Sequence, residues 1–271
     1  MSNRSKLPFK HGRNVCIFCG GESDTKISDE HIWPQWAAET LPGSTDHGIV
    51  AGKVDKKDQT AVLHKNYQRQ GAVTNFRVKR VCRGCNSGWM GTYEEGVRHF
   101  LEPMMLGERV FLNEGDQQLL LEYLTYKMLV LDVGFADPFI PPEAAQNFFT
   151  SRAMPDEMDL YILRCIEGEW QLGMRCIGGA FSREMLDPKM PPNVKSFAVG
   201  FGHLFVFAVF RRGGEFDYDF ETGTSIRLWP RFSPMILWPT VRSINSVQAE
   251  GIAMSVWNTA GAPNFIDYGK A

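Results

Sequence analysis

Four cysteines in two closely spaced pairs are the residues whose types and spacing most directly predict chemistry. Cys16 and Cys19 form one Cys-x-x-Cys pair, and Cys82 and Cys85 form the second. The tight turn within each pair can direct both sulfurs to one side, so that two pairs surround a single metal ion. Four thiolates favour Zn²⁺ and leave no coordination position open for a substrate. The sequence therefore predicts one closed, structural zinc site.

Other interpretations of these cysteines are a redox pair or unligated buried thiols. A redox site needs only one Cys-x-x-Cys, whereas this chain has two. Cys165 and Cys176 stand in apolar, strand-like patterns without a partner spacing, and we expect them to be small core residues. Residues 15–42 hold little apolar material, so we expect this part of the chain to unfold when zinc is removed.

A histidine that follows an acidic residue lies between the two cysteine pairs. The segment reads Glu30-His31-Ile32-Trp33-Pro34, and an asparagine at 86 directly follows the second pair in the sequence CNSGWMGTYEE. In these motifs the chain resembles the HNH endonucleases, the zinc-knuckled branch of the ββα-metal (His-Me finger) nucleases. Their pattern is Cys-x-x-Cys, an acid followed by His-Ile and a nearby Pro, and a second Cys-x-x-Cys followed by His or Asn. The resemblance covers about residues 15–95.

The resemblance implies an endonuclease that hydrolyses phosphodiester bonds, with His31 as the general base that takes a proton from the attacking water. It also implies a catalytic divalent metal held by Glu30 and Asn86, whose oxygen donors favour Mg²⁺ or Mn²⁺. Glu94, on the helix after Asn86, would add a carboxylate to that metal. Asn75 is the residue nearest to the asparagine that orients the histidine in the family. Proteins of this family serve bacterial or phage processes such as restriction, defence, packaging and mobile elements.

Two features of the motif modify this expectation. Side chains at adjacent strand positions point to opposite faces, so Glu30 and His31 can serve one site only if the hairpin is bent. Asn86 is an amide where other family members carry a histidine, which predicts weaker metal binding. The tryptophans at 33, 36 and 89 could stack on bases, but we expect them to form the core of the module.

A basic cluster accompanies the second cysteine pair. Its members are Arg77, Lys79, Arg80 and Arg83. They predict contact with phosphates, with a solvated strand edge as the equal alternative. Residues 1–100 hold 15 Lys and Arg against 10 Asp and Glu, and the remainder holds 14 against 21. The N-terminal part is thus the one suited to approach nucleic acid, with DNA as the expected partner.

Two further hypotheses remain open beside the nuclease. The chain could be a zinc-containing nucleic-acid-binding protein whose catalytic metal site is weak or inactive. It could also be a structural or protein-interaction domain that keeps zinc only for folding. If one site per chain cuts both strands of DNA, a homodimer is expected.

Composition limits the class of protein. The chain has 271 residues, 44% of them hydrophobic and 22% charged, with a net charge of −2, which is ordinary globular composition. We find no apolar run long enough to span a membrane and no apolar core in a secretory signal after the basic start. These features predict a protein of the reducing cytoplasm, without a membrane partner.

The elements that must position these residues are predicted as an α+β arrangement. A helix should begin near Asn86 and end or kink at Pro103, and apolar spacing predicts a second helix over 115–132. From 158 onward the sequence predicts strands. We therefore expect a flexible basic arm over 1–14, a zinc-knuckled HNH-like module over 15–100, a helical connector over 101–135 and an antiparallel β-rich accessory domain over 136–271. Residues 43–72 are interpreted as a long insertion between the two halves of the site.

Overall fold

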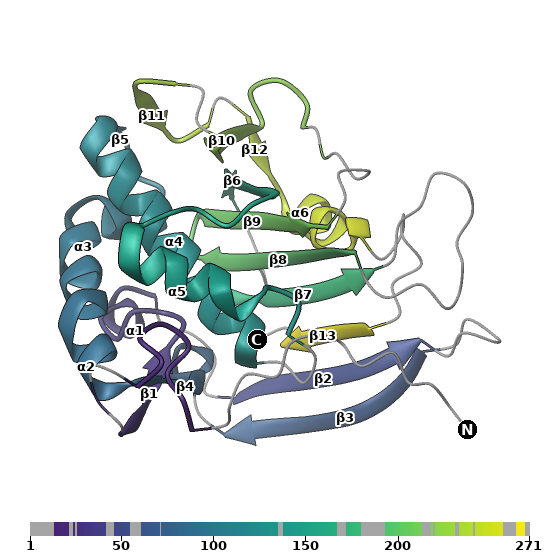
Figure 1. Ribbon diagram of the computed structural model, residues 1–271. Coiled ribbons are helices and arrows are strands. Elements are labelled where there is room, and N and C mark those ends of the chain that lie inside the picture. Colours follow the sequence, from purple (N-terminus) through teal and green to yellow (C-terminus); the bar gives the residue numbers. More distant parts are fainter. Residues whose placement is uncertain are drawn as a thin grey trace.

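Helices and sheets are combined in a computed structural model of the chain, which confirms the α+β class (Figure 1). It describes residues 14–21, 24, 26–41, 46–54, 61–70, 72–134, 138–166, 172–179, 193–212, 218, 220–230, 233–240, 242–256 and 264–268. Residues 46–54, 61–70 and 264–268 are described by their backbone alone. Of the basic arm predicted over 1–14, residues 1–13 lie outside the described residues.

A nine-stranded, mostly antiparallel sheet is the largest element. Its order is β10-β6-β9-β8-β7-β13-β2-β3, and β12 pairs with β6 in parallel. The strands are β2 (Asp46–Val54), β3 (Ala61–Gln70), β6 (Met158–Cys165), β7 (Met174–Gly179), β8 (Val194–Phe201), β9 (Leu204–Arg211), β10 (Ser225–Trp229), β12 (Ser243–Ile244) and β13 (Asn264–Tyr268).

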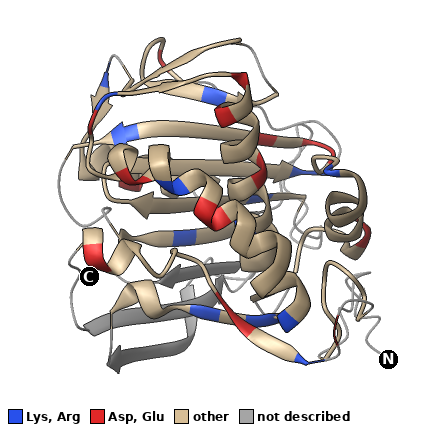
Figure 2. Cartoon of the chain, turned by 90° about the vertical axis from the view of Figure 1, so that its left-hand side faces the viewer, with Lys and Arg blue, Asp and Glu red and all other residues tan. Residues whose placement is uncertain are grey.

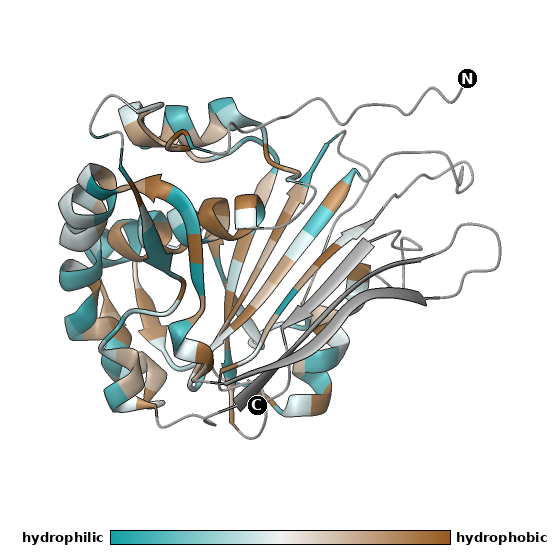
Figure 3. Ribbon diagram, turned by 90° about the horizontal axis from the view of Figure 1, so that it is seen from below, coloured by the Kyte–Doolittle hydropathy of each residue, from teal (hydrophilic) through white to brown (hydrophobic). Residues whose placement is uncertain are grey.

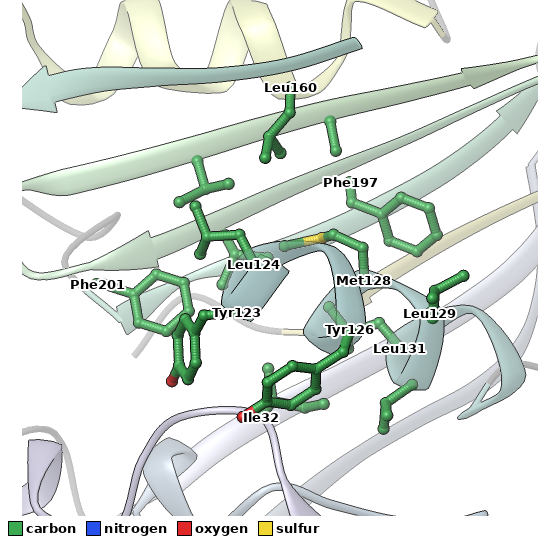
Figure 4. Packing of buried hydrophobic residues seen from close by; sticks show 14 of the residues in the cluster. Ile32, Tyr123, Leu124, Tyr126, Met128, Leu129, Leu131, Leu160, Phe197 and Phe201 are labelled. Carbon is green, nitrogen blue, oxygen red and sulfur yellow. The ribbon is translucent and has the colours of Figure 1, made fainter. Parts of the chain in front are cut away.

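The central strands β6, β8 and β9 are apolar on both faces because helices cover both (Figure 3). Alternate residues such as Leu160 and Phe197 face α4 (Glu114–Gly134), as Figure 4 shows. Their neighbours along the strand, such as Tyr161 and Ala198, pack in a second cluster with α6 (Ser246–Ala253). Burial on both faces explains why these strands read as nearly continuous apolar runs rather than as alternating patterns.

A smaller sheet carries the motif residues. In it β1 (Ile27–His31) pairs antiparallel with β4 (Arg77–Cys82), with an irregularity in register between Ser28 and Glu30. The chain then continues through α2 (Arg83–Cys85) and η2 (Asn86–Met90) into α3 (Gly91–Met105). The result is a strand–strand–helix unit beside the large sheet (Figure 1).

The remaining elements are short. They are α1 (Ala37–Thr40), η1 (Val73–Asn75), β5 (Val110–Leu112), α5 (Pro142–Ser151) and β11 (Ile236–Trp238). Strands β5 and β11 form a two-stranded ribbon of their own.

The helix predicted over 115–132 is confirmed, and it runs from Glu114 to Gly134. Burial extends beyond the residues of the predicted apolar spacing, since every residue from Leu120 to Val133 is buried. The predicted helix near Asn86 is also present, with non-helical backbone at Gly88 and with Pro103 inside its last turn.

The predicted division of the chain does not coincide with the division into sheets. The long insertion predicted over 43–72 contains β2 and β3, which belong to the large sheet: β2 pairs with β13, and β3 pairs with β2 at the edge. The large sheet therefore contains strands from both the expected nuclease module and the expected accessory domain. The first part of the expected β-rich accessory domain contains the helix α5. One continuous core joins the cysteine-bearing unit to α4 and the sheet. Among the helices of the described ranges, none combines the length and apolar character needed to cross a bilayer.

Candidate functional site

The four predicted cysteines converge. The sulfurs of Cys16, Cys19, Cys82 and Cys85 all lie within 4.8 Å of one another, and all four residues are buried. The first pair reaches the second because the Ile17 amide donates to the Arg80 carbonyl, which adds the knuckle to the edge of β4. Two pairs that are far apart in the sequence thus become one cluster.

This cluster has the chemistry that a tetrahedral metal ion requires. Zinc–sulfur bonds of about 2.3 Å place the sulfurs of a tetrahedral site about 3.8 Å apart. Cys19 Sγ and Cys82 Sγ are 3.5 Å apart. A hydrogen bond from Cys85 lowers the pKa of Cys16 to about 4, whereas burial raises the pKa of Cys82 to about 11 and the bond to Cys16 raises that of Cys85, so one thiolate is favoured at Cys16. These four cysteines could hold a metal ion such as zinc. In the described part of the chain no other group of His, Cys, Asp or Glu side chains converges in this way.

His31 ends β1 at a half-buried position. Its Cα is the register partner of Arg77 on β4, and its Nδ1 lies 3.4 Å from the Gln35 amide nitrogen. Burial lowers the pKa of the imidazole, and the positive charges of Arg77 and Lys127 lower it further. At neutral pH the ring is therefore neutral, which is the form that can accept a proton.

Glu30 points to the opposite side of β1, into the protein, and only 4% of its surface is exposed. Its Oε1 accepts a hydrogen bond of 2.7 Å from Lys127 Nζ on α4. Lys127 Nζ also donates to the His31 carbonyl at 2.6 Å and approaches Glu94 Oε2 on α3 at 3.4 Å. Burial raises the pKa of Glu30, while the Lys127 charge opposes that rise. Glu30 and Glu94, the two predicted metal-binding carboxylates, thus lie around one ammonium group.

Aromatic rings complete the surroundings of this ammonium. Lys127 Nζ lies 5.4 Å from the ring centroid of Tyr123 and 5.2 Å from that of Tyr126. Both tyrosines extend from α4 toward Ile32, the residue after His31 (Figure 4). Cation–π attraction is strongest at desolvated sites, so these rings help to hold a charge that is fully buried.

The two predicted asparagines lie toward opposite ends of β1. The Asn86 side-chain nitrogen donates to Ser28 Oγ at 3.0 Å and to the Asp29 carbonyl at 2.9 Å. These bonds tie the second cysteine pair to β1. Asn75 is exposed and immediately precedes Phe76, whose carbonyl accepts a hydrogen bond from the Ile32 amide. Asn75 therefore lies beside the end of β1 that carries His31.

The predicted basic cluster lies on and just beyond β4. Arg77, Lys79 and Arg83 are exposed, and Arg80 is half-buried. Lys79 Nζ is 3.7 Å from Asp29 across the strand pair. Figure 2 shows basic segments beside an acidic one in the lower part of the view, where this strand pair lies.

The tryptophans serve the core, as predicted. The Trp33 indole nitrogen donates to the Gly200 carbonyl at 2.8 Å, which ties the segment after β1 to β8 of the large sheet. Trp89 packs edge-on against Phe18 and Tyr126, with the Arg152 guanidinium over its ring. The knuckles are thereby joined to α4 and α5.

Lys127 is the residue that sequence reasoning missed. It lies 97 positions from Glu30, within the apolar pattern of α4. The available signal was that a lysine occupies a position of the buried helix face, between Tyr123 and Leu131. A fully buried lysine needs a paired carboxylate or another acceptor.

Comparisons of the chain with family models, with curated proteins and with solved structures find no match in any of the three.

Proposed function

We propose that this protein is an endonuclease that hydrolyses phosphodiester bonds of nucleic acid, most readily DNA, with His31 as the general base. The observation that carries the proposal is the setting of His31. His31, with a neutral and half-buried imidazole, is the last residue of β1. The four-cysteine cluster and Asn86 hold this strand against the segment that leads into α3. A structural zinc ion in that cluster would keep the histidine in position without taking part in the reaction.

The reaction would proceed by attack of water on the phosphorus atom. His31 takes one proton from that water as the new phosphorus–oxygen bond forms, and the bond to the leaving oxygen breaks. Arg77, across the strand pair from His31, is suited to bind the phosphate oxygens on which negative charge accumulates. Lys79, Arg80 and Arg83 would contact neighbouring phosphates of the strand.

A divalent Mg²⁺ or Mn²⁺ belongs to this proposal through the resemblance to the HNH nucleases. When bound, it would neutralise charge on the phosphate and on the leaving oxygen. Glu30, Asn86 and Glu94 are the proposed oxygen donors. The ion would have to share Glu30 and Glu94 with Lys127, so we expect weak binding of the metal.

The contact between Lys127 and Glu30 favours one alternative function, which is binding of nucleic acid without cleavage. Lys127 already supplies a cation to Glu30, and the Asn86 amide nitrogen is engaged with β1. A chain of this kind would retain the zinc cluster and the basic face and would release no product.

The test is cleavage of supercoiled plasmid and of labelled single-stranded DNA and RNA, with and without added Mg²⁺ or Mn²⁺. No chelator is used, because chelation would also remove zinc. His31→Ala is compared with His99→Ala, since His99 is an exposed histidine of α3 outside the site. We expect His31→Ala to lose at least about 100-fold in rate and His99→Ala to keep the wild-type rate. Full activity of His31→Ala would refute the proposal, and tight binding without product under every metal would favour the alternative.

A further inference from the structure

We propose that Lys127 is a positioning residue for His31: from helix α4 it fixes the backbone from which the side chain of the general base extends. The inference rests on the proposed function of His31 and assigns a role to a residue that does not itself contact substrate.

The first support is the set of oxygen atoms around the ammonium. A lysine ammonium has three N–H donors. Lys127 Nζ directs them to Glu30 Oε1 at 2.7 Å, the His31 carbonyl at 2.6 Å and Glu94 Oε2 at 3.4 Å. Two of these acceptors belong to consecutive residues at the end of β1. The side chain therefore fixes the backbone from which the imidazole extends.

The second support is the rigidity of the element that carries Lys127. Helix α4 is buried along almost its whole length, with Leu124 and Met128 facing the sheet (Figure 4). The Trp33 hydrogen bond to Gly200 is an independent link from the segment after β1 to the same sheet. The position of His31 is thus fixed relative to the large sheet, and not by the short β1–β4 pair alone. Catalytic groups need such support because small displacements of the base reduce the rate steeply.

The charges around the imidazole supply a readout for the test. Arg77 approaches it from β4 and Lys127 from α4, whereas Glu94 on α3 and Asp29 on β1 oppose them. Glu30 neutralises much of the Lys127 charge at short range, but it is not among the groups that shift His31. Removal of Lys127 therefore changes both the position and the protonation of the base. A residue that only stabilised the fold would change neither in the folded protein.

The experiment compares two paired replacements in the full chain. Lys127→Met with Glu30→Gln removes this buried pair without leaving a lone charge. The matched control is Lys195→Met with Asp132→Asn, because that pair is also buried, with 2.5 Å between Lys195 Nζ and Asp132 Oδ1, and lies away from His31. The imidazole titration of His31 is followed by NMR in zinc-loaded protein without Mg²⁺, and single-turnover cleavage is followed across pH.

We expect the Lys127→Met/Glu30→Gln protein to show a His31 titration midpoint that rises toward that of a free histidine. The acidic limb of its pH–rate profile should move to higher pH together with this midpoint. Its kcat should fall on the order of 100-fold, with little change in KM. The control pair should leave the His31 titration unchanged. If the folded Lys127→Met/Glu30→Gln protein keeps the wild-type His31 titration and the wild-type acidic limb of its pH–rate profile, the proposal is overturned.

Two provisions keep this test decisive. If the double variant does not fold, Lys127→Arg carries the test, because it keeps the charge and changes the geometry. Lys127→Arg should keep the low titration midpoint of His31 while it reduces kcat. A wild-type kcat in that variant would overturn the proposal. If wild-type protein cleaves no substrate, the proposed function fails, whereas the NMR titration still decides whether Lys127 controls His31.

Discussion

His31 and Arg77 face each other across the β1–β4 pair, as register partners at the end of the strand. A guanidinium in this position disfavours protonation of the imidazole. In the proposed reaction it would also provide a phosphate ligand directly beside the base. The proton acceptor and the anion-binding group proposed for the reaction thus come from opposite strands, and their spacing depends on this one cross-strand pairing.

The first prediction concerns pH. Because burial, Arg77 and Lys127 lower the pKa of His31, the neutral base persists to lower pH than in a free histidine. We expect the acidic limb of kcat/KM to lie below the titration range of a free histidine, which is centred at about 6.5. The unfolded chain would take up a proton at His31 before the folded chain does, so the free energy of unfolding should also decrease as pH falls through this range. A cleavage limb above the range of free histidine would contradict this account.

Arg77 should carry part of the affinity for nucleic acid. Arg77→Gln removes one phosphate contact, so binding should weaken for all sequences alike and the salt dependence of log Kd should fall by about one unit. Arg109→Gln, an exposed arginine beyond the end of α3, is the control and should change neither quantity. Titrations of a labelled duplex at several salt concentrations measure both. Equal effects of the two replacements would indicate that the basic face is only a solvated strand edge.

Metal analysis tests the cysteine cluster. The purified chain should contain about one zinc ion, held by four thiolates. Cys82→Ala should abolish zinc binding and lower the melting temperature strongly, because the metal joins two segments that have little core of their own. Cys165→Ala, at a buried cysteine of β6 outside the cluster, should retain zinc. Retention of stoichiometric zinc by Cys82→Ala would show that the metal binds elsewhere.

The link between Trp33 and the sheet can be measured as stability. Trp33→Phe removes the donor to the Gly200 carbonyl and leaves that acceptor buried, which should cost about 1–3 kcal/mol of the free energy of unfolding. Trp36→Phe is the matched control, since the Trp36 indole nitrogen has no hydrogen-bond partner among the described residues. Denaturant unfolding compares the two. We expect the larger loss for Trp33→Phe, and the reverse order would argue against this link.

A fragment of residues 1–105 should not form an active nuclease. It contains the four cysteines, His31 and Glu30, but it lacks Lys127 and the Gly200 carbonyl. Without α4 and the large sheet, residues such as Ile32 and Trp33 lose the core in which they are buried, so we expect little stable structure even with zinc present. Circular dichroism and the plasmid assay test this directly. A folded fragment that cuts as well as the whole chain would show that the module is autonomous.

The sequence by itself determined the local parts of this protein. The spacing of the two Cys-x-x-Cys pairs predicted the cluster, because the geometry within each pair is set by a short turn. The apolar spacing after Asp116 predicted α4, and the apolar runs after 158 predicted strands. These features depend on neighbours in the chain, and so they can be recognised without knowledge of the fold.

Only the tertiary structure decided what surrounds the motif. The pairing of β2 with β13 depends on contacts across most of the chain, and a polar segment gave no sign of it. The pairing of Lys127 with Glu30 joins residues 97 positions apart. From the sequence alone, Glu30 is predicted to be a metal ligand. In the fold it accepts a hydrogen bond from a buried lysine, because α4 packs against the end of β1 and a buried charge there requires a partner.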